Sequence, residues 1–463
     1  MVFSSIIFLF LFFPITLGIY FLVPKNMKNL ILLVASIFFY AWGEPVYVVL
    51  MIFSAVFNYI MGLDISVREN SPKLKRASVA FAIIVNLFIL SFFKYYGFFM
   101  DNINEIFNVS IAYTKLPLPI GISFYTFQAL SYVIDVYRNK IAVQKSLLKF
   151  SLYLTMFPQL IAGPIVKYVD IEKQLDERHV TLVEFGSGCE IFIKGLAKKV
   201  LLANTLGLIY TNISALSNDE STIITAWIGI IAYTLQIYFD FSGYSDMAIG
   251  LGRMFGFEFM KNFNYPYISK SVTEFWRRWH ISLSTWFKEY VYIPLGGNRV
   301  SKSMHIRNIL TVWFLTGFWH GASWNFIVWG LYYGGFLLLE KYFVAKILAK
   351  VPTIVQSLYT LIVVAVGWVF FSQPDLYAAM NYLNLMFSFK NGLINSISLY
   401  YLKTSIIIIV LGILIARPNV NILFERLKSS RPLVAILILM VIFMLCIASL
   451  VYDTYNPFLY FRF

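Results

Sequence analysis

The chain has 463 residues, of which 59% are hydrophobic and 13% charged, and its mean hydropathy is +0.73. This excess of apolar side chains over what a soluble core of this size can bury excludes a soluble protein and predicts an integral membrane protein. The net charge of +14 would suit a nucleic-acid partner, but the Lys and Arg residues are concentrated in alternate loops between apolar stretches. We therefore expect a multi-pass protein of the cytoplasmic membrane, with the lipid bilayer as its partner and no nucleic acid.

Apolar stretches near membrane-spanning length recur along the chain, each able to cross about 30 Å of hydrocarbon as a helix. The clearest are 1–23, 77–100, 222–251, 353–371 and 432–451. Because a spanning backbone must satisfy its own hydrogen bonds, we predict an all-α polytopic fold with about eleven or twelve transmembrane helices. The first stretch has no basic residue before it and no small-residue cleavage site after it, which indicates a retained helix rather than a signal peptide.

The distribution of charge in the loops predicts the orientation. The basic loops, which hold most of the 37 Lys and Arg residues, are 24–29, 64–76, 138–149, 167–199, 253–307, 341–350 and 417–431. The intervening loops are poor in Lys and Arg and carry acidic residues. The positive-inside rule then places the basic loops in the cytoplasm and both termini outside.

Two apolar regions are interrupted by residues that break helices. Gly43-Glu44-Pro45 predicts two short segments that meet at the outer surface. Region 150–166 lies between two basic loops and contains Pro158, Gly163 and Pro164, so a re-entrant segment fits better than a full crossing. Irregular backbone at membrane depth is tolerated only where protein or a water-filled cavity covers it, which predicts a cavity near the cytoplasmic side.

The basic region that follows predicts an amphipathic helix over 271–292. Its aromatic and aliphatic residues recur at helical spacing, whereas Arg277, Arg278 and Lys288 lie mostly on other faces. A basic helix rich in Trp is typical of one that lies in the membrane interface, with His280 here at the border of its apolar face. Since no repeat, linker or soluble domain is evident, we expect a single membrane-embedded domain over 1–463.

Two carboxylates lie in or beside the long apolar stretch that ends near 251. Asp246 and Arg253 are seven residues apart and share a helical face, so a buried ion pair is the structural interpretation of this segment. The functional interpretation is that Asp240 and Asp246 line a polar cavity. A proton-coupled transporter using both as a relay is the alternative from another class of protein.

His320 lies in the apolar segment "GFWHGASWNF", residues 317–326. An ionisable side chain within a membrane is costly and marks a candidate functional site, although a neutral imidazole bonded inside the bundle is the structural alternative. Gly317 and Gly321 share a face and allow another helix to approach closely. An apolar wall around the ring is expected from Trp313, Trp319, Trp324 and Trp329. Burial should keep the imidazole neutral and able to accept a proton, as a general base requires.

The other titratable groups do not indicate a metal site. His179 and His305 lie in polar loops and are expected to be exposed. Cys189 and Cys446 are far apart, and no HExxH pattern accompanies any histidine, so neither a disulfide framework nor a metal centre is predicted.

Several blocks in the central part of the chain, about 115–335, are specific in combination. They are "LIAGPI" (160–165), "YFDFSGYSDMAIG" (238–250), "FWRRWHISLSTWF" (275–287), "PLGGNR" (294–299) and "TGFWHGASWNFIVWG" (316–330). Together they resemble the membrane-bound O-acyltransferase family. The resemblance is strongest to the branch of the alginate and peptidoglycan O-acetyltransferase membrane subunits and the teichoic acid D-alanyl transfer protein.

This resemblance implies a ring of transmembrane helices around a central funnel, with His320 as the catalytic base and His280 as the second family histidine. Trp319 and Asn325, which flank the base in its motif, would line the cavity or support it. The implied reaction moves an acyl group, acetyl in the nearest branch, from a cytoplasmic thioester to an exported or cell-wall polysaccharide. The donor would be acetyl-CoA or an acyl carrier protein thioester, and no bound cofactor is implied. D-alanyl transfer to teichoic acid is the alternative within the same fold.

The chain ends in an extracytoplasmic tail, 452–463, that contains "NPFLYFRF". Aromatic residues at the end of a helix commonly anchor it at the membrane interface. The tail also resembles an acyl-relay motif of the polysaccharide-acetylating members of this branch. By that likeness, Tyr460 would receive the acyl group and pass it to a separate extracytoplasmic acetyltransferase. A tyrosine hydroxyl is a usable nucleophile only beside a base.

Overall fold

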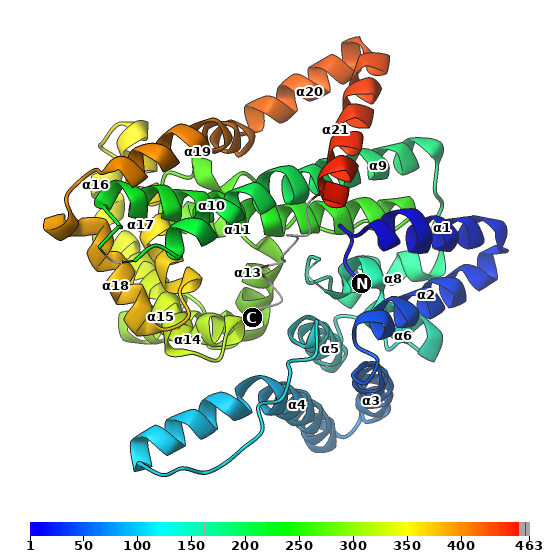
Figure 1. Ribbon diagram of the computed structural model, residues 1–463. Helices are drawn as coiled ribbons and strands as arrows, with labels where there is room; N and C mark the ends of the chain where they lie inside the picture. The colour runs from blue at the N-terminus through cyan, green and yellow to red at the C-terminus, as the bar shows by residue number, and fades with distance from the viewer. Residues whose placement is uncertain (162, 218, 453–458, 460–463) are drawn as a thin grey trace. The chain divides into compact units, whose positions relative to one another are not determined.

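The computed structural model describes every residue of the chain except 162, 218, 453–458 and 460–463. All the regular elements among the described residues are helices (Figure 1). Six of these helices are long and apolar enough to cross a membrane: α3 (Val48–Val67), α4 (Pro72–Phe107), α11 (Ile223–Met254), α17 (Thr353–Ser372), α19 (Ser396–Ile415) and α21 (Pro432–Tyr452). The predicted all-helical, polytopic class is confirmed, while the number of spans and the ring around a funnel stay predictions.

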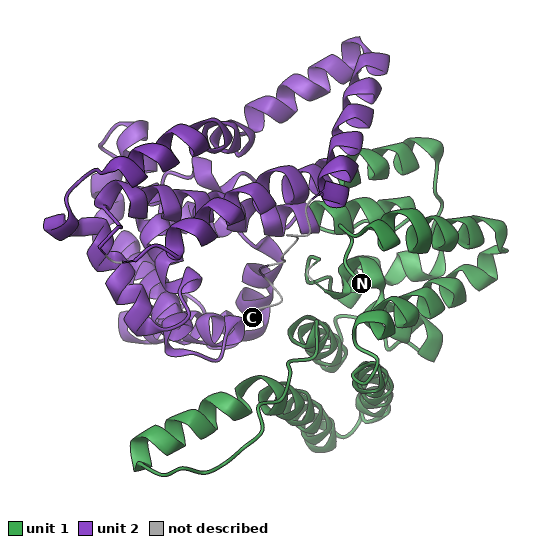
Figure 2. Ribbon diagram, in the orientation of Figure 1, with its two compact units in different colours: residues 1–192, 245–260 green, residues 193–244, 261–463 purple. Residues whose placement is uncertain are grey.

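The described chain divides into two compact units (Figure 2). Unit 1 comprises residues 1–192 and 245–260, and unit 2 comprises 193–244 and 261–463. Helices α9 (Leu182–Ala197) and α11 each contribute residues to both units. The expected single domain stays a prediction.

Unit 1 is built from short and long helices around a core of phenylalanine rings. Its further helices are α1 (Phe13–Leu22), α2 (Lys28–Gly43), α5 (Ile122–Tyr137), α6 (Leu147–Thr155), α7 (Phe157–Leu160) and α8 (Tyr168–Asp176). Both predicted interruptions are found here. Helix α2 ends at Gly43 and α3 begins at Val48, and α6 and α7 are separated at Met156, where ψ is 114° and Pro158 follows in the first turn of α7.

Unit 2 contains the remaining helices and the residues of the predicted site. They are α10 (Asn204–Ser214), α12 (Val272–Arg278), α13 (Ile281–Phe287), α14 (Lys302–His320), α15 (Trp324–Leu339), α16 (Ala345–Leu348), α18 (Leu376–Phe387) and α20 (Pro418–Ser430). Three π-helical segments join them, Lys198–Ala203, Lys288–Tyr292 and Glu340–Val344. Aromatic rings dominate the core, with Phe275, Trp329, Tyr333 and Trp368 all almost fully buried.

Helices α14 and α15 form a tightly packed hairpin. A Cβ atom added to Gly317 would lie 2.3 Å from the Phe326 carbonyl oxygen, and one added to Gly330 would lie 2.2 Å from the Trp313 carbonyl oxygen. A Cβ atom on Gly321 would lie 2.3 Å from the Phe326 ring. The predicted close approach across Gly317 and Gly321 is therefore confirmed, and it fixes the end of α14, where His320 lies.

The single amphipathic helix predicted over 271–292 is wrong. The segment forms α12 and α13, which are separated by an extended Trp279 and by His280 in the left-handed region at φ 46°. Hydrogen bonds to the backbone of residues 262–264 stabilise the break. The N–H of Ile281 donates to the carbonyl oxygen of Asn262, and the N–H of Asn264 donates to the carbonyl oxygen of Arg278. The apolar face is buried inside unit 2, so it faces protein rather than the membrane interface.

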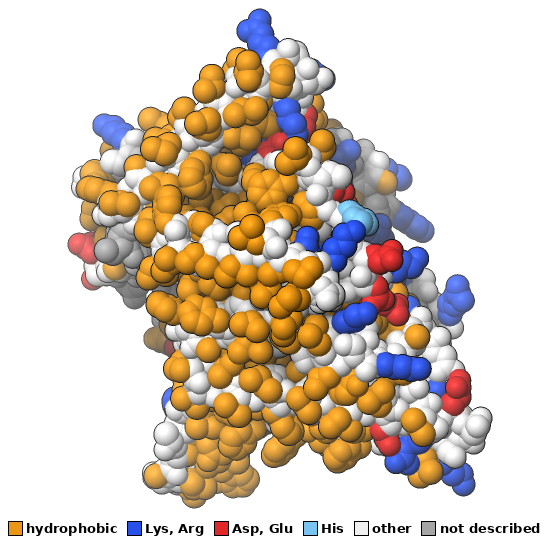
Figure 3. Space-filling model, turned by 90° about the vertical axis from the view of Figure 1, so that its right-hand side faces the viewer, with side chains coloured by type: hydrophobic (Ala, Val, Ile, Leu, Met, Phe, Trp, Pro, Cys, Tyr) orange, Lys and Arg blue, Asp and Glu red, His pale blue; other side chains and the backbone are white. Residues whose placement is uncertain are grey.

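The surface carries large hydrophobic side chains in unbroken runs. Hydrophobic side chains cover most of the face in Figure 3, and Lys, Arg, Asp and Glu gather toward its right-hand side. Along α21 alone, Leu433, Leu437, Val441 and Met444 are more than half exposed. Apolar surface of this extent is unusual on a soluble protein and fits contact with lipid.

Candidate functional site

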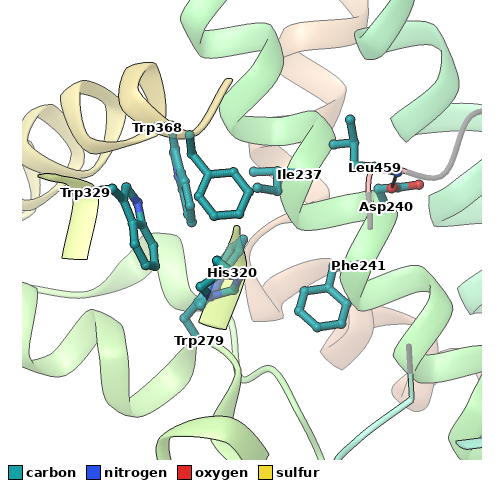
Figure 4. A pocket seen from close by; sticks show the side chains of 9 residues that line it. Ile237, Asp240, Phe241, Trp279, His320, Trp329, Trp368 and Leu459 are labelled. Carbon is teal, nitrogen blue, oxygen red and sulfur yellow. Dashed lines mark hydrogen bonds between the residues drawn. The ribbon is translucent and has the colours of Figure 1, made fainter. Parts of the chain in front are cut away.

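A narrow cavity lies within unit 2. Residues of α11, α15 and α17 line it, together with Trp279, His320 and Leu459 (Figure 4). The three helices contribute Ile237, Asp240 and Phe241 (α11), Trp329 (α15), and Trp368 and Phe371 (α17). It offers about 10 Å³ to the centre of a water molecule, which is room for about one water. Its wall is almost entirely aromatic and aliphatic, so the few polar groups in it are those that can act on a bound molecule.

His320 is the last residue of α14 and is 5% exposed. The rings of Trp319, Trp329 and Phe371 surround it, with centroids 5.0, 5.0 and 5.2 Å from that of the imidazole and near-perpendicular planes. A histidine held in such an apolar enclosure at the wall of a cavity is suited to accept a proton from a group that enters the cavity.

Trp329 adds a hydrogen-bond donor to the same wall. Its side chain is 1% exposed, and within the described part of the chain its indole N–H has no acceptor within hydrogen-bonding distance. Buried donors are normally paired, and an unpaired one is a common feature of functional sites. The N–H of Trp329 is therefore available to a bound oxygen beside His320.

A buried ion pair marks another part of the cavity wall. Lys199 Nζ lies 2.7 Å from Asp240 Oδ1, and both side chains are 3% exposed. Lys199 also donates to Asn204 Oδ1 at 3.0 Å, and the backbone N–H of Leu459 donates to Asp240 Oδ2 at 2.9 Å. Reasoning from sequence placed Asp240 at a cavity but missed Lys199, whose only signal is a charge at the start of an apolar run.

The second predicted carboxylate belongs to a different environment. Asp246 and Arg253 both lie in unit 1, and the guanidinium of Arg253 pairs with Glu258 at 3.6 Å and donates to Ser187 Oγ at 2.8 Å. The ion pair proposed between Asp246 and Arg253 is thus replaced by these contacts. Asp246 is not among the described residues that line the cavity in unit 2.

His280 lies behind the cavity wall. It is 1% exposed, and its ring centroid is 4.7 Å from that of Phe241 and 6.2 Å from that of Trp319, the residue next to His320. The backbone N–H of Ser282 donates to Asn262 Oδ1, which identifies that atom as an acceptor. His280 Nδ1, 3.1 Å from the same oxygen, is therefore the protonated nitrogen, and Nε2 is left as the acceptor.

The electrostatic state of His280 follows from its burial. Desolvation lowers the pKa of His280 from 6.5 to about 3, so the ring is neutral at physiological pH. Among the described residues, His280 does not line the cavity itself but contacts Phe241, which does, and Trp319, which precedes His320.

The remaining residues singled out from the sequence fall into structural positions. Asn325 donates to the carbonyl oxygens of Phe370 and Gln373 at 3.0 and 2.9 Å, which ties the start of α15 to the end of α17. His179 is exposed as expected. The expectation for His305 is wrong, because it is 3% exposed.

Packing against other polar side chains explains the burial of His305. Its Nδ1 lies 2.8 Å from the hydroxyl of Tyr342, and Lys341 Nζ lies 3.0 Å from its Nε2. His305 thus lies in the first part of α14 rather than in a polar loop. Within the described residues, no three His, Cys, Asp or Glu side chains gather as a metal site would require.

Tyr460 lies outside the described residues. The preceding residue, Leu459, is described: it is 8% exposed, lines the cavity and bonds to Asp240. From the sequence, only the resemblance of the tail to an acyl-relay motif implied that the end of the chain would approach His320.

Comparison with known proteins identifies the family of the chain. The profile of the membrane-bound O-acyltransferase family matches residues 138–380. The chain is 40% identical, over the full length of both proteins, to a probable alginate O-acetylase of Pseudomonas putida. It is 34% identical to a peptidoglycan O-acetyltransferase of Helicobacter pylori, over 97% of this chain and 90% of that protein.

A more distant relative covers only the central part of the chain. A teichoic acid D-alanyltransferase of Bacillus subtilis is 27% identical over 48% of this chain and 59% of its own length. The profile match spans α12, α14 and α15, and so includes both His280 and His320. The chain belongs to the membrane-bound O-acyltransferase family.

Proposed function

We propose that this O-acyltransferase transfers acetyl groups from a cytoplasmic thioester to an exported or cell-wall polysaccharide. The observation that carries the proposal is the buried His320 at the wall of a narrow, apolar cavity. The extended similarity to proteins named alginate O-acetylase and peptidoglycan O-acetyltransferase supports acetyl as the acyl group and a polysaccharide as the acceptor.

The narrow cavity suits transfer across a membrane. Acetyl-CoA or an acyl carrier protein thioester carries phosphate charges, whose transfer into hydrocarbon costs on the order of tens of kcal/mol in the Born limit. An acetyl group carries no charge. A passage that admits only the thioester end lets the acetyl group cross while the carrier stays in the cytoplasm, and the basic segment 253–307 would attract that carrier.

His320 acts as the general base in this proposal. It takes the proton of an acceptor hydroxyl while the hydroxyl oxygen attacks the thioester carbonyl. The N–H of Trp329 stabilises the negative oxygen that forms. The carbon–sulfur bond then breaks, the thiolate leaves and it takes up the proton from His320. Base catalysis of this kind contributes roughly 10²–10⁴-fold in rate, and one oxyanion donor contributes about 10²–10³-fold.

Tyr460 is the acceptor hydroxyl that we propose for the first transfer. It is bonded to Leu459, which lines the same cavity as His320. The acetyl ester formed on Tyr460 would pass to a separate extracytoplasmic acetyltransferase and then to the polysaccharide. Because Leu459 is buried in the cavity wall, its position favours this role over an aromatic anchor at the membrane interface.

The two alternative functions find less support. A transporter would need Asp240 to exchange protons, but Asp240 is held in an ion pair with Lys199. D-alanyl transfer to teichoic acid rests on a relative that matches about half of the chain. We further propose that the protein lies in the cytoplasmic membrane with both termini outside, as the distribution of Lys and Arg predicts.

The proposal is tested by mass analysis of the polymers exported by cells with and without the gene. Loss of O-acetyl groups from one polysaccharide in the deleted strain is expected and would name the acceptor. Unchanged acetylation of every exported polymer would refute the proposal.

The relay is tested separately with Tyr460→Phe, which keeps the aromatic ring and removes only the hydroxyl. Phe461→Tyr in the same background serves as a matched control, since it restores a hydroxyl one residue away. Loss of polymer acetylation in both variants is expected, and normal acetylation in Tyr460→Phe would show that the relay is wrong.

A further inference from the structure

We propose that the buried Lys199–Asp240 ion pair is a docking site for the C-terminal segment of the chain. Asp240 holds this segment by the backbone N–H of Leu459 and so fixes the register of the tail at the cavity that His320 lines. Asp240 and Lys199 are then positioning residues for the acyl relay. The inference rests on the proposed function for its purpose, although the docking itself can be measured without any acyl transfer.

The contacts of the carboxylate carry the argument. One oxygen of Asp240, Oδ1, faces Lys199 at 2.7 Å, and the other, Oδ2, accepts the N–H of Leu459 at 2.9 Å. Leu459 lies 219 positions from Asp240 in the sequence. A buried carboxylate needs donors for its lone pairs as well as a counter-charge, and it is strongly destabilising when one of them is missing. The tail therefore supplies the N–H donor that Oδ2 of this buried carboxylate uses.

Close packing of the backbone holds the ion pair in place. A Cβ atom on Gly243 would lie 2.7 Å from the carbonyl oxygen of Gly195 and 3.0 Å from the backbone nitrogen of Lys199, so α11 packs directly on the backbone around Lys199. Lys199 belongs to the π-helical segment Lys198–Ala203, and π-helical turns often occur at functional sites. Its second contact, with Asn204 Oδ1, further fixes the ammonium group.

A hydrogen bond to a backbone N–H fixes which position of the tail lies at Asp240, whatever side chain that position carries. With the N–H of Leu459 on Asp240, the side chain of Leu459 packs into the cavity wall, and the next residue in the chain is Tyr460 (Figure 4). A slip of one residue would present Phe461 or Leu459, neither of which has a hydroxyl, in place of Tyr460, which carries the only hydroxyl among residues 458–463. The docking site thus selects the residue that carries a nucleophile.

Two double variants distinguish the effect of the hydrogen-bond acceptor at position 240 from the effect of the two charges. Lys199→Met with Asp240→Asn removes both charges and keeps an oxygen that accepts the Leu459 N–H. Lys199→Met with Asp240→Leu removes both charges and the acceptor at similar volume. Removing a buried ion pair as a unit avoids the unpaired charge that a single substitution would leave.

Hydrogen–deuterium exchange of the C-terminal peptide, residues 458–463, measures docking directly in the full-length protein. We expect wild-type protection in the Asn variant and exchange faster by about tenfold or more in the Leu variant, given the usual strength of such a bond. Equal exchange in the two double variants, both with wild-type melting temperatures, would overturn the proposal. Leu459→Pro, which lacks the N–H, should match the Leu variant, whereas Leu459→Ala keeps the donor.

A second measurement links docking to acyl transfer. Mass analysis of the same peptide should find acetyl-Tyr460 in the Asn variant and at least about tenfold less in the Leu variant. If acetyl-Tyr460 forms equally in both, the docking proposal fails and the relay stands. If exchange behaves as expected but no variant, including the wild type, carries acetyl on Tyr460, the docking stands and the relay fails.

Discussion

The packing of α14 on α15 makes Gly330→Ala a sharp test of how the site is positioned. The added Cβ atom would lie 2.2 Å from the Trp313 carbonyl oxygen and 3.1 Å from the backbone nitrogen and Cα of Gly317. These neighbours are backbone atoms and cannot rotate away, so the helices must separate by about 1 Å to reach ordinary contact. His320 is three residues beyond Gly317, and Trp329 directly precedes Gly330, so the shift moves the base relative to its proposed oxyanion donor.

The expected effect on catalysis is larger than the effect on stability. A displacement of about 1 Å in a catalytic constellation can reduce the rate about 100-fold, whereas overpacking typically costs about 1–3 kcal/mol. Gly335→Ala is the matched control in the same helix, since its added Cβ has no atom within 4 Å. Replacing a helical glycine with alanine there should raise stability by about 0.5–1 kcal/mol.

The assay compares polymer acetylation at equal membrane abundance, together with the melting temperature of each purified variant in detergent. Gly330→Ala should lose most acetylation with a modest fall in melting temperature, and Gly335→Ala should keep both. Wild-type acetylation in Gly330→Ala, or an equal loss in Gly335→Ala, would refute the claim that this helix contact positions the site.

Three further predictions follow from the contacts of the site. Trp329→Phe keeps an aromatic ring and removes the N–H, so the turnover number should fall about 10²–10³-fold at unchanged abundance. Trp324→Phe, on a half-exposed residue, is the control and should have no effect. Equal activity of the two variants would exclude Trp329 as a donor. Since burial lowers the pKa of His280 from 6.5 to about 3, its contribution to stability is complete above pH 6.5 and is lost as the pH falls toward 3. The melting temperature should therefore fall more steeply below pH 6.5 in the wild type than in His280→Asn, and parallel curves would contradict the assignment. Asn325→Leu leaves two carbonyl oxygens at the end of α17 without their donor. The loss should lower the free energy of unfolding by about 1–3 kcal/mol for each carbonyl, and it should appear as a lower melting temperature. Asn325→Asp, which also lacks the amide donor, should not restore the melting temperature.

Predictions from the sequence were correct where the cause of a structural feature lies within a few residues of it. Pro158 separates α6 from α7 because it has no N–H to donate to the carbonyl of the preceding helical turn, and Gly317 allows close helix packing because it has no Cβ atom. Composition alone was sufficient for the membrane class, because no soluble core buries so many apolar residues.

Features that depend on distant partners could not be predicted from the sequence. The helix expected through His280 is broken because backbone near Asn262 pairs with it, and helical periodicity says nothing about such a partner. Lys199 was missed because its charge is explained only by Asp240, 41 positions away in the sequence. The contact of Leu459 with the cavity joins residues 219 positions apart, a separation at which a single sequence carries no signal.

The central claim is that acyl transfer takes place at His320, and the most direct measurement is the acetyl content of the exported polysaccharide in cells that carry His320→Ala. His179→Ala, on an exposed histidine, is the control, and membrane abundance of each variant is matched to the wild type. We expect acetyl content to fall to the level of the deleted strain in His320→Ala and to stay at the wild-type level in His179→Ala. Acetylation that persists in His320→Ala would contradict the account.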